Sequence, residues 1–464
     1  MKALKVPNTF VLIFLFILLM AAATWILPGG EFARRQVEGR TVLVPGSFRR
    51  VPHRPQGMGA VLVAPFKGFV EAADIIAFIL FVGGAFGVVQ ATGALTALIG
   101  SVVRAYHRSR TVRLLFIPMF MALFSLFGSV FGMSEEVIPF VLIFVPMAIS
   151  LGYDSIVGVS IPFLGAGIGF ASAFLNPFTL GVAQGIAELP PFSGMGYRIL
   201  LWLVFTAAGI VFVLRYAARV RRSPESSPVY DLDGYWRRRA ETSPHLAQLT
   251  RLHRGVIGLF LAGIALLILG VLSWKWFIPE MAALFFGLGI AAGLIGGLSG
   301  SKIAATFVDG ARDLVGAALI VGFARGILVV AADGNIIDTI LHGLSGLVRA
   351  AHPVVAGQVM LLVQSCINFF VPSGSGQAAL TMPIMSPLSD LVGVTRQTAV
   401  LAFQFGDGLS NMIIPTSAVT MGVLGLARIP WERWARWLLP LEAILFLMAA
   451  VLLIPPILGH WGPF

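Results

Sequence analysis

Long uncharged apolar runs are the feature that most limits what this chain can fold into. The run from Phe10 to Leu27 contains no ionisable side chain, and similar runs recur to the end of the chain. A helix crosses a bilayer core of about 30 Å with about 20 apolar residues. Only 11% of the 464 residues are charged, against about 25% in a soluble domain. The sequence therefore predicts an all-α polytopic membrane protein, and the continuous runs do not suit a β-barrel.

Charge distribution sets the expected topology. The formal net charge is +11, and the basic residues cluster in loops, where they orient a membrane protein by staying cytoplasmic; no nucleic-acid partner is expected. We predict about nine transmembrane helices and two re-entrant hairpins, with a cytoplasmic N-terminus, a retained first crossing and an external C-terminus. Residues 29–70 are expected to form an external segment, and residues 71–99 a second crossing.

Four apolar blocks are interrupted by polar, Gly or Pro residues. The block 114–150 is broken at Gly132-Met133-Ser134-Glu135-Glu136, and the block 354–390 at Pro372 to Gln377. Each is predicted to be a re-entrant hairpin, because broken backbone at membrane depth is tolerated where protein or a cavity surrounds it. The blocks 155–187 and 397–427 are predicted to be broken helices.

The two halves of the chain resemble each other. Gly83 and Gly87 correspond to Gly322 and Gly326, and Ser134 corresponds to Ser375, at a nearly constant spacing of about 240 residues. We divide the chain into a first repeat (1–220), a cytosolic linker (221–254), an extra connecting helix (255–275) and a second repeat (276–464). The odd extra crossing inverts the second repeat, an architecture found in many secondary transporters.

The interruptions carry short, oxygen-bearing side chains beside Gly and Pro. Such oxygens can replace the water shell of a small cation, and half-helix amino termini can bind a carboxylate. The alternative is that these residues only cap kinked helices and bond to neighbouring helices. The symmetric set of four breaks favours a binding site for a small-molecule substrate. The candidate substrate- or ion-binding residues are Ser134, Glu135, Asn176, Thr179, Ser373, Ser375, Gln377, Asp407, Ser410, Asn411 and Thr416.

Carboxylates near the centre leave the cargo open. A buried carboxylate is costly and usually marks ion or proton handling, and Arg325 is a candidate partner for Glu135 or Glu136. Carboxylates would repel a dianion unless they are protonated or hold a cation. Cation-coupled anion transport and transport of a cationic amino acid therefore both fit. No cofactor is expected, and sodium or a proton is the candidate coupling ion.

Motifs for enzymes are missing from the sequence. There is no G-x-x-x-x-G-K-[ST] phosphate loop, no H-E-x-x-H zinc motif and no nucleophile elbow around Pro372 to Gly376, so an enzyme is not expected. A metal site is expected only as a sodium site among the residues above. A passive channel is the rival from another class, but hairpins that enter from opposite sides favour a site that is closed to both.

Several longer stretches are similar to a known family. Pro7 to Phe10, Thr24 to Phe32, Asn176 to Thr179, Pro372 to Leu380 and Gln404 to Asn411 resemble the anaerobic four-carbon dicarboxylate carrier (DcuC) family, in its YfcC-like branch. The resemblance covers nearly the whole chain.

That family belongs to the ion transporter superfamily. The resemblance implies paired hairpins, a scaffold with a mobile transport domain, elevator-type alternating access, a homodimer and a place in the cell inner membrane. It also implies that the hairpin tips and the breaks bind substrate and ion. Members are named as dicarboxylate carriers or as basic amino acid antiporters, so the resemblance leaves both cargoes open. The Gly-Met-Ser-Glu-Glu tip departs from the Ser-Asn-Thr tip of better-known superfamily members.

Overall fold

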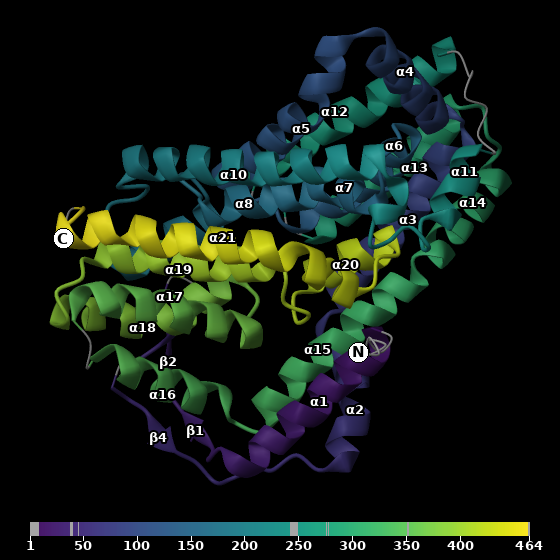
Figure 1. Cartoon of the computed structure of the whole chain (residues 1–464). Coiled ribbons are helices and arrows are strands. Elements are labelled where there is room, and N and C mark those ends of the chain that lie inside the picture. Colours follow the sequence, from purple (N-terminus) through teal and green to yellow (C-terminus); the bar gives the residue numbers. More distant parts are fainter. Residues whose placement is uncertain are drawn as a thin grey trace.

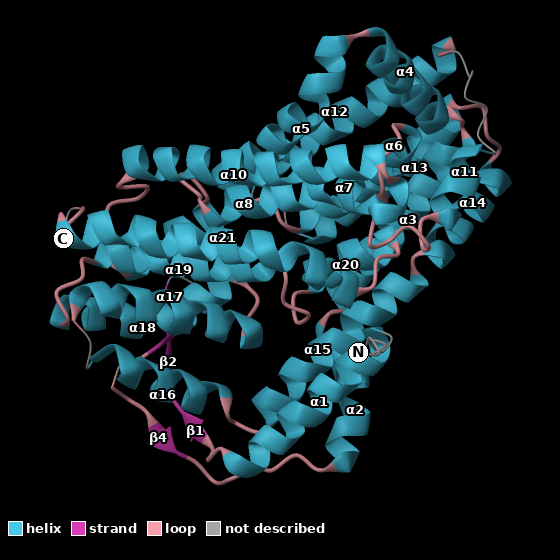
Figure 2. Ribbon diagram, in the orientation of Figure 1, coloured by secondary structure: helices cyan, strands magenta, loops and turns pink. Residues whose placement is uncertain are grey.

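The computed structural model of the chain describes residues 9–37, 40–44, 46–241, 249–274, 276, 278–349 and 352–462. Nearly all of them are helical (Figure 2). Six of the described helices are long and apolar enough to cross a membrane, and a bent pair would make a seventh. The prediction of a helical multi-pass membrane protein is confirmed. The predicted number of nine crossings stays a prediction.

The first half begins with a helix and four short strands. Strands β1 and β4 pair antiparallel, with Gly30 opposite Arg50, and β2 pairs with β3, with Arg34 opposite Leu43. The elements in order are α1 (Thr9–Ile26), β1 (Gly30–Glu31), β2 (Arg34–Val37), β3 (Arg40–Leu43), β4 (Arg49–Arg50), α2 (Met58–Glu71), α3 (Ala73–Ala91), α4 (Ala94–Arg108), α5 (Arg110–Phe131), η1 (Glu135–Val137), α6 (Ile138–Ser150), α7 (Ser155–Val159), η2 (Ser160–Leu164), α8 (Gly165–Ala171), η3 (Pro177–Gly181), α9 (Val182–Ile186) and α10 (Met195–Arg222).

The second half follows a polar connection that includes the short η4 (Pro224–Ser226) and α11 (Gly234–Glu241). In the second half, the helices that follow α13 include broken and unbroken ones. They come in the same order as the helices that follow the strands in the first half. The elements are α12 (Arg251–Trp274), α13 (Ile278–Ile295), α14 (Gly300–Asp313), α15 (Val315–Asp333), α16 (Ile337–Arg349), α17 (Pro353–Phe370), α18 (Gly374–Leu391), α19 (Arg396–Asn411), α20 (Ala418–Ala427) and α21 (Trp431–Leu458).

Two groups of helices make up the molecule. In the α2–α15 group, α2 packs along α15, α3 contacts α13 and α14, and α1 and α12 complete the group. In the α8–α19 group, α8 packs on α5 and α19, and α19 also contacts α17, α18 and α21. Figure 1 shows the second group as a stack of helices on the left, with α15, α1 and α2 crossing at the lower right. Helix α20 contacts α15 of the first group and α21 of the second group and so joins the two groups.

Small residues let helices of the α2–α15 group approach closely. A Cβ atom on Gly87 would come within 2.9 Å of the Gly310 Cα, and one on Gly83 would come within 2.9 Å of the Gly310 carbonyl oxygen. Glycine spacing of this kind allows backbones to touch. Gly326 of α15 packs as closely against α2, where its Cβ would lie 3.0 Å from the Ala64 carbonyl oxygen.

The N-terminal region contains a helix within the segment that is predicted to be external. Met58–Glu71 forms α2, whose Val61, Ala64 and Gly68 are buried, and the external position of residues 29–70 stays a prediction. Pro65 and Lys67 lie inside this helix and made it resemble a loop in sequence. The linker residues 242–248 lie outside the described part of the chain.

Candidate substrate-binding site

The first hairpin tip is built by a glycine and two neighbouring carboxylates. Helix α5 ends at Gly132, whose φ of +72° lies in the left-handed region that glycine adopts without strain. The chain turns through Ser134 into η1, and Glu136 Oε2 accepts a hydrogen bond from the Ser134 amide at 2.8 Å. Glu136 is buried and Glu135 is half-buried. The tip therefore holds two acidic side chains between α5 and α6.

The second tip lies between α17 and α18. Helix α18 starts at Gly374 after the extended residue Ser373. Inside this hairpin, the Gln377 amide donates to the Gln364 carbonyl oxygen (2.9 Å) and to its side-chain oxygen (2.8 Å). These bonds join the two helices just below the tip.

The breaks in the two crossing helices expose polar groups at matching places. Asn176 Oδ1 accepts bonds from the amides of Phe178 (2.9 Å) and Thr179 (3.2 Å) and so begins η3. In the other half, α19 ends at Asn411, whose Nδ2 donates to Asp407 Oδ1 at 2.9 Å. Each break is thus ordered by its own asparagine.

The two tips and the two breaks meet. A Cβ on Gly132 would lie 2.6 Å from Asn176 Oδ1, so the first tip covers the first break. A Cβ on Gly374 would collide with Thr179 and lie 3.0 Å from Asp407 Oδ2, so the second tip touches both breaks. The Gln404 amide also donates to the Phe170 carbonyl oxygen at 2.6 Å. Four interruptions that are distant in sequence form one cluster.

A cavity of about 330 Å³ lies at this cluster. Its volume suits a small metabolite. Among its lining residues are four carboxylates and one guanidinium. The polar and charged lining residues are Glu71, Asp74, Ser134, Glu135, Glu136, Thr179, Arg325, Ser373, Ser375, Asn411, Thr416 and Ser417.

Several buried polar atoms at the cluster have no hydrogen-bond partner among the described residues. They are Asn176 Nδ2, Thr179 Oγ1, Asp407 Oδ2, Asn411 Oδ1 and Thr416 Oγ1. Leaving one such atom unpaired costs about 1–3 kcal/mol, and native structures rarely gather many of them. Their position at the two helix breaks fits groups that a solute or an ion completes. No cluster of three or more His, Cys, Asp or Glu side chains suitable for a metal occurs within the described ranges.

The structure places some of the predicted residues on the cavity wall and the others away from it. Seven of them line the cavity: Ser134, Glu135, Thr179, Ser373, Ser375, Asn411 and Thr416. Asn176 and Asp407 do not line it but lie beside Gly132 and Gly374, which do. Gln377 braces the second hairpin, and Ser410 accepts from the Asn368 amide (2.8 Å) and donates to the Gly406 carbonyl oxygen (2.5 Å). A binding role for all eleven residues stays a prediction.

Arg325 does not have the partner suggested by the sequence. Its Nε donates to Glu71 Oε2 at 3.0 Å, and no bond joins it to Glu135 or Glu136 among the interactions of the described residues. Glu71 was missed because it lies at the boundary between the predicted external segment (29–70) and the predicted second crossing (71–99), and a charged residue at the end of α2 gives no local sign of what it faces. The cavity thus acquires an ion pair that the sequence pattern did not predict.

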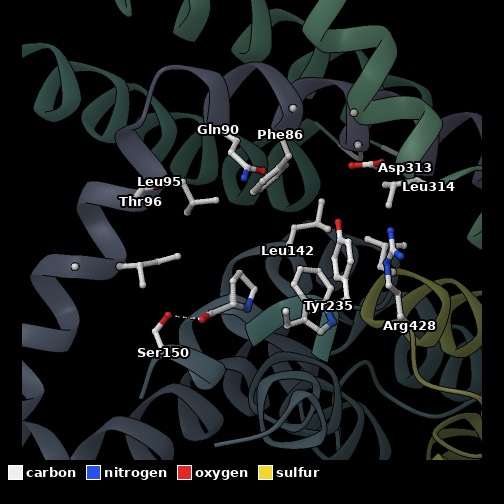
Figure 3. Close-up of a pocket in the computed structure, with 18 of the residues that line it drawn as sticks. Phe86, Gln90, Leu95, Thr96, Leu142, Ser150, Tyr235, Asp313, Leu314 and Arg428 are labelled. Atoms are coloured by element: carbon white, nitrogen blue, oxygen red, sulfur yellow. Dashed lines mark hydrogen bonds between the residues drawn. The ribbon is translucent and has the colours of Figure 1, made fainter. Parts of the chain in front are cut away.

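A second cavity, of about 130 Å³, lies elsewhere between the two helix groups. Figure 3 shows Phe86, Leu95 and Leu142 facing it, with Asp313 and Arg428 at one end. Its walls come from α3, α4, α6, α11, α14 and α20 and are largely apolar. It touches neither a hairpin tip nor a break, so it is the weaker candidate for a metabolite site.

Comparison with known families decides the classification. Residues 6–457 match the model of the family described as "DcuC: C4-dicarboxylate anaerobic carrier". The chain belongs to this DcuC family. Its resemblance to the YfcC-like branch is also confirmed, because it is 40% identical to "Putative basic amino acid antiporter YfcC" of Escherichia coli (strain K12), over 97% of this chain and 96% of that protein.

Other relatives of this DcuC family member are more distant. It is 29% identical to an uncharacterized protein of Haemophilus influenzae, over 98% of this chain and 97% of that one. Two solved structures are similar at low identity. Neisseria gonorrhoeae MtrF matches at 18% identity with a TM-score of 0.42 over 97% of this chain and 95% of its own. Alcanivorax borkumensis YdaH matches at 17% with a TM-score of 0.40 over 98% and 100%.

Proposed function

We propose that this protein is a secondary active transporter of small carboxylate-bearing metabolites, working by alternating access. Family membership supports carriage of a solute across a membrane. The observation that carries the proposal is the meeting of both hairpin tips and both helix breaks at one cavity. Unpaired polar atoms at such breaks are what a substrate or a coupling ion would complete.

The proposal includes an inverted repeat with an elevator-type movement. The recurring order of helices supports two equivalent halves. In this scheme the α8–α19 group carries the substrate and the α2–α15 group stays fixed. We further propose a homodimer in the cell inner membrane, with a cytoplasmic N-terminus, an external C-terminus, and sodium or a proton as coupling ion.

Charge at the cavity favours a basic amino acid over a four-carbon dicarboxylate. Glu71, Asp74, Glu135 and Glu136 oppose Arg325 alone among the ionisable lining residues that the structure describes. A dianion would meet an excess of like charge at close range, which costs several kcal/mol in specificity. A cationic side chain would instead be attracted. The name of the Escherichia coli relative points to the same cargo, with exchange as the mode of transport.

Uptake into proteoliposomes tests the proposal. Radiolabelled arginine, lysine and succinate are supplied with no gradient, with a sodium gradient, with a proton gradient, and with each solute preloaded for exchange. Accumulation above electrochemical equilibrium, or uptake driven by preloaded solute, is expected. Flux that only follows the solute's own gradient would identify a passive channel.

Variants at the two breaks tie uptake to the proposed site. Asn176→Ala and Asn411→Ala are each expected to abolish uptake while folded protein remains in the membrane. Ser150→Ala, at the far end of α6, removes only a bond to its own helix (Ser150 Oγ to Pro146 O, 2.9 Å) and is the matched control. Full uptake by both asparagine variants would exclude this site.

A further inference from the structure

Arg325 and Glu71 form an ion pair on the cavity wall that belongs to the α2–α15 group. The Arg325 Nε donates to Glu71 Oε2 at 3.0 Å, and both side chains are partly exposed, at 39% and 45%. Only the Nε of the guanidinium is used in this bond. Within the described residues no acceptor is found for the two terminal nitrogen groups. The two terminal nitrogen groups of the Arg325 guanidinium therefore remain available at the cavity.

Backbone packing fixes this pair in position. A Cβ on Gly68 would collide with the Gly322 carbonyl oxygen and lie 2.5 Å from the Gly326 nitrogen. Helices α2 and α15 therefore touch along their backbones, which brings Glu71, one turn after Gly68, opposite Arg325. A guanidinium whose Nε is already anchored loses less conformational freedom when it binds a further anion.

The cavity has opposite charge on its other wall. Glu135 and Glu136 come from the first hairpin tip, in the α8–α19 group. A solute that carries both a carboxylate and a cation can satisfy both walls, since a guanidinium binds a carboxylate through two parallel hydrogen bonds. We propose that Arg325, anchored by Glu71, recognises the carboxylate of the cargo from the α2–α15 group. This inference rests on the proposed function and adds a specificity-determining residue to it.

Paired solutes that differ by one carboxylate test the role of Arg325. Arginine is compared with agmatine, which lacks the α-carboxylate, by calorimetric binding to the purified full chain. The wild-type protein is expected to prefer arginine. Arg325→Gln should weaken arginine binding about ten- to a hundredfold, the range expected for loss of a charge-assisted bond, and leave agmatine binding within about twofold. Glu71→Gln frees the guanidinium and should keep the preference for arginine.

A neighbouring ion pair supplies the control. Lys67 Nζ lies 2.6 Å from Asp333 Oδ2 on the same two helices and with similar exposure, but neither residue lines the cavity. Lys67→Gln should leave both affinities unchanged. Equal weakening of arginine and agmatine by Arg325→Gln, or unchanged arginine binding, would overturn the assignment of Arg325.

The same test separates the inference from the choice of cargo. If the wild-type protein binds succinate and neither arginine nor agmatine, the basic amino acid cargo is wrong. Succinate and butyrate then form the pair, and selective loss of succinate binding in Arg325→Gln still supports carboxylate recognition. If none of the four solutes binds, the proposed function and the role of Arg325 are both overturned.

Discussion

The Asn176 side chain has two separate roles, which two different substitutions can distinguish. Its Oδ1 holds the start of η3, whereas its buried Nδ2 has no partner among the described residues. Asn176→Ala removes both functions, but Asn176→Asp keeps an oxygen for the cap. We expect both variants to lose uptake, and the alanine variant alone to lose about 1 kcal/mol of stability, the usual value of an N-cap. Uptake and thermal denaturation in detergent measure the two effects.

The aspartate variant is the informative one. Normal uptake by Asn176→Asp would show that the Nδ2 group takes no part in binding, and would leave Asn176 with a purely structural role. Loss of uptake with normal thermal stability would place the donor in the transport cycle. The Ser150→Ala protein, prepared in parallel, shows any loss of uptake or stability that comes from the preparation and not from the change at Asn176.

At the scale of elements, the polar connection docks onto the start of α7. Asp154 Oδ1 accepts from the Val157 amide at 2.9 Å and caps that helix, and its other oxygen accepts from Ser227 Oγ at 2.6 Å. Asp233 Oδ2 accepts from the Ser155 amide at 3.0 Å. Asp154 and Asp233 are both almost fully buried. The connection is therefore held against the first broken helix by two buried carboxylates.

Docking of this connection should depend on pH. Burial raises the pKa of Asp233 to about 6, above the usual value of about 3.9 in an unfolded chain. The folded state then binds a proton at Asp233 more readily, so the contribution of Asp233 to stability is greatest below about pH 4 and falls as pH rises to about 6. Asp233→Asn keeps an acceptor but cannot ionise. Its melting temperature should exceed that of the wild type by about 3 °C at pH 7.5 and match it near pH 4.

Thermal denaturation across pH 4–8 in one detergent measures this difference. Other carboxylates titrate over the same range, so the quantity compared is the variant minus the wild type. Asp231→Asn provides a contrast, since hydrogen bonding to Arg433 lowers the pKa of Asp231. A constant difference between Asp233→Asn and wild type at all pH values would contradict the prediction.

Interruptions within apolar helices were easier to predict from the sequence than short amphipathic helices. Glycine, proline and acidic residues within apolar blocks indicated all four interruptions, because these residues disturb helices locally. The helices α14 and α16 were not recognised as separate elements. Helix α14 carries Lys302, Asp309 and Arg312 within 14 residues, so it contains no long apolar run. Such helices are stabilised by packing on neighbours, which a single sequence does not display.

At the scale of the whole molecule, the meeting of the four interruptions could not be derived from spacing alone. The repeat indicated that tips and breaks are equivalent, but their distances depend on how α5, α8, α17 and α19 pack. The ion pair of Glu71 and Arg325 joins residues 254 positions apart. Long-range pairs of this kind leave no local pattern in a single sequence. The sequence therefore indicated most residues of the candidate site, but not which helices surround them.

Relative movement of the two helix groups is the last prediction. A Cβ on Gly422 of α20 would lie 3.8 Å from Val321 Cγ2 of α15, across the contact between the groups. The chain has a single cysteine, Cys366, so Cys366→Ser gives a background free of thiols. Cysteines at positions 321 and 422 lie close enough to be bridged by Hg²⁺. Bridging should arrest uptake in proteoliposomes, and excess dithiothreitol should restore it, because an elevator movement must separate these helices.

A pair inside one group controls for the reagent. A Cβ on Gly289 would lie 3.1 Å from the Ala85 Cβ, and both residues belong to the α2–α15 group. Bridging cysteines at positions 85 and 289 should leave uptake intact, since these helices move together or not at all. If the 321–422 bridge forms and transport continues at the normal rate, α20 does not move relative to α15. The cargo would then have to cross by a rearrangement confined to the hairpins.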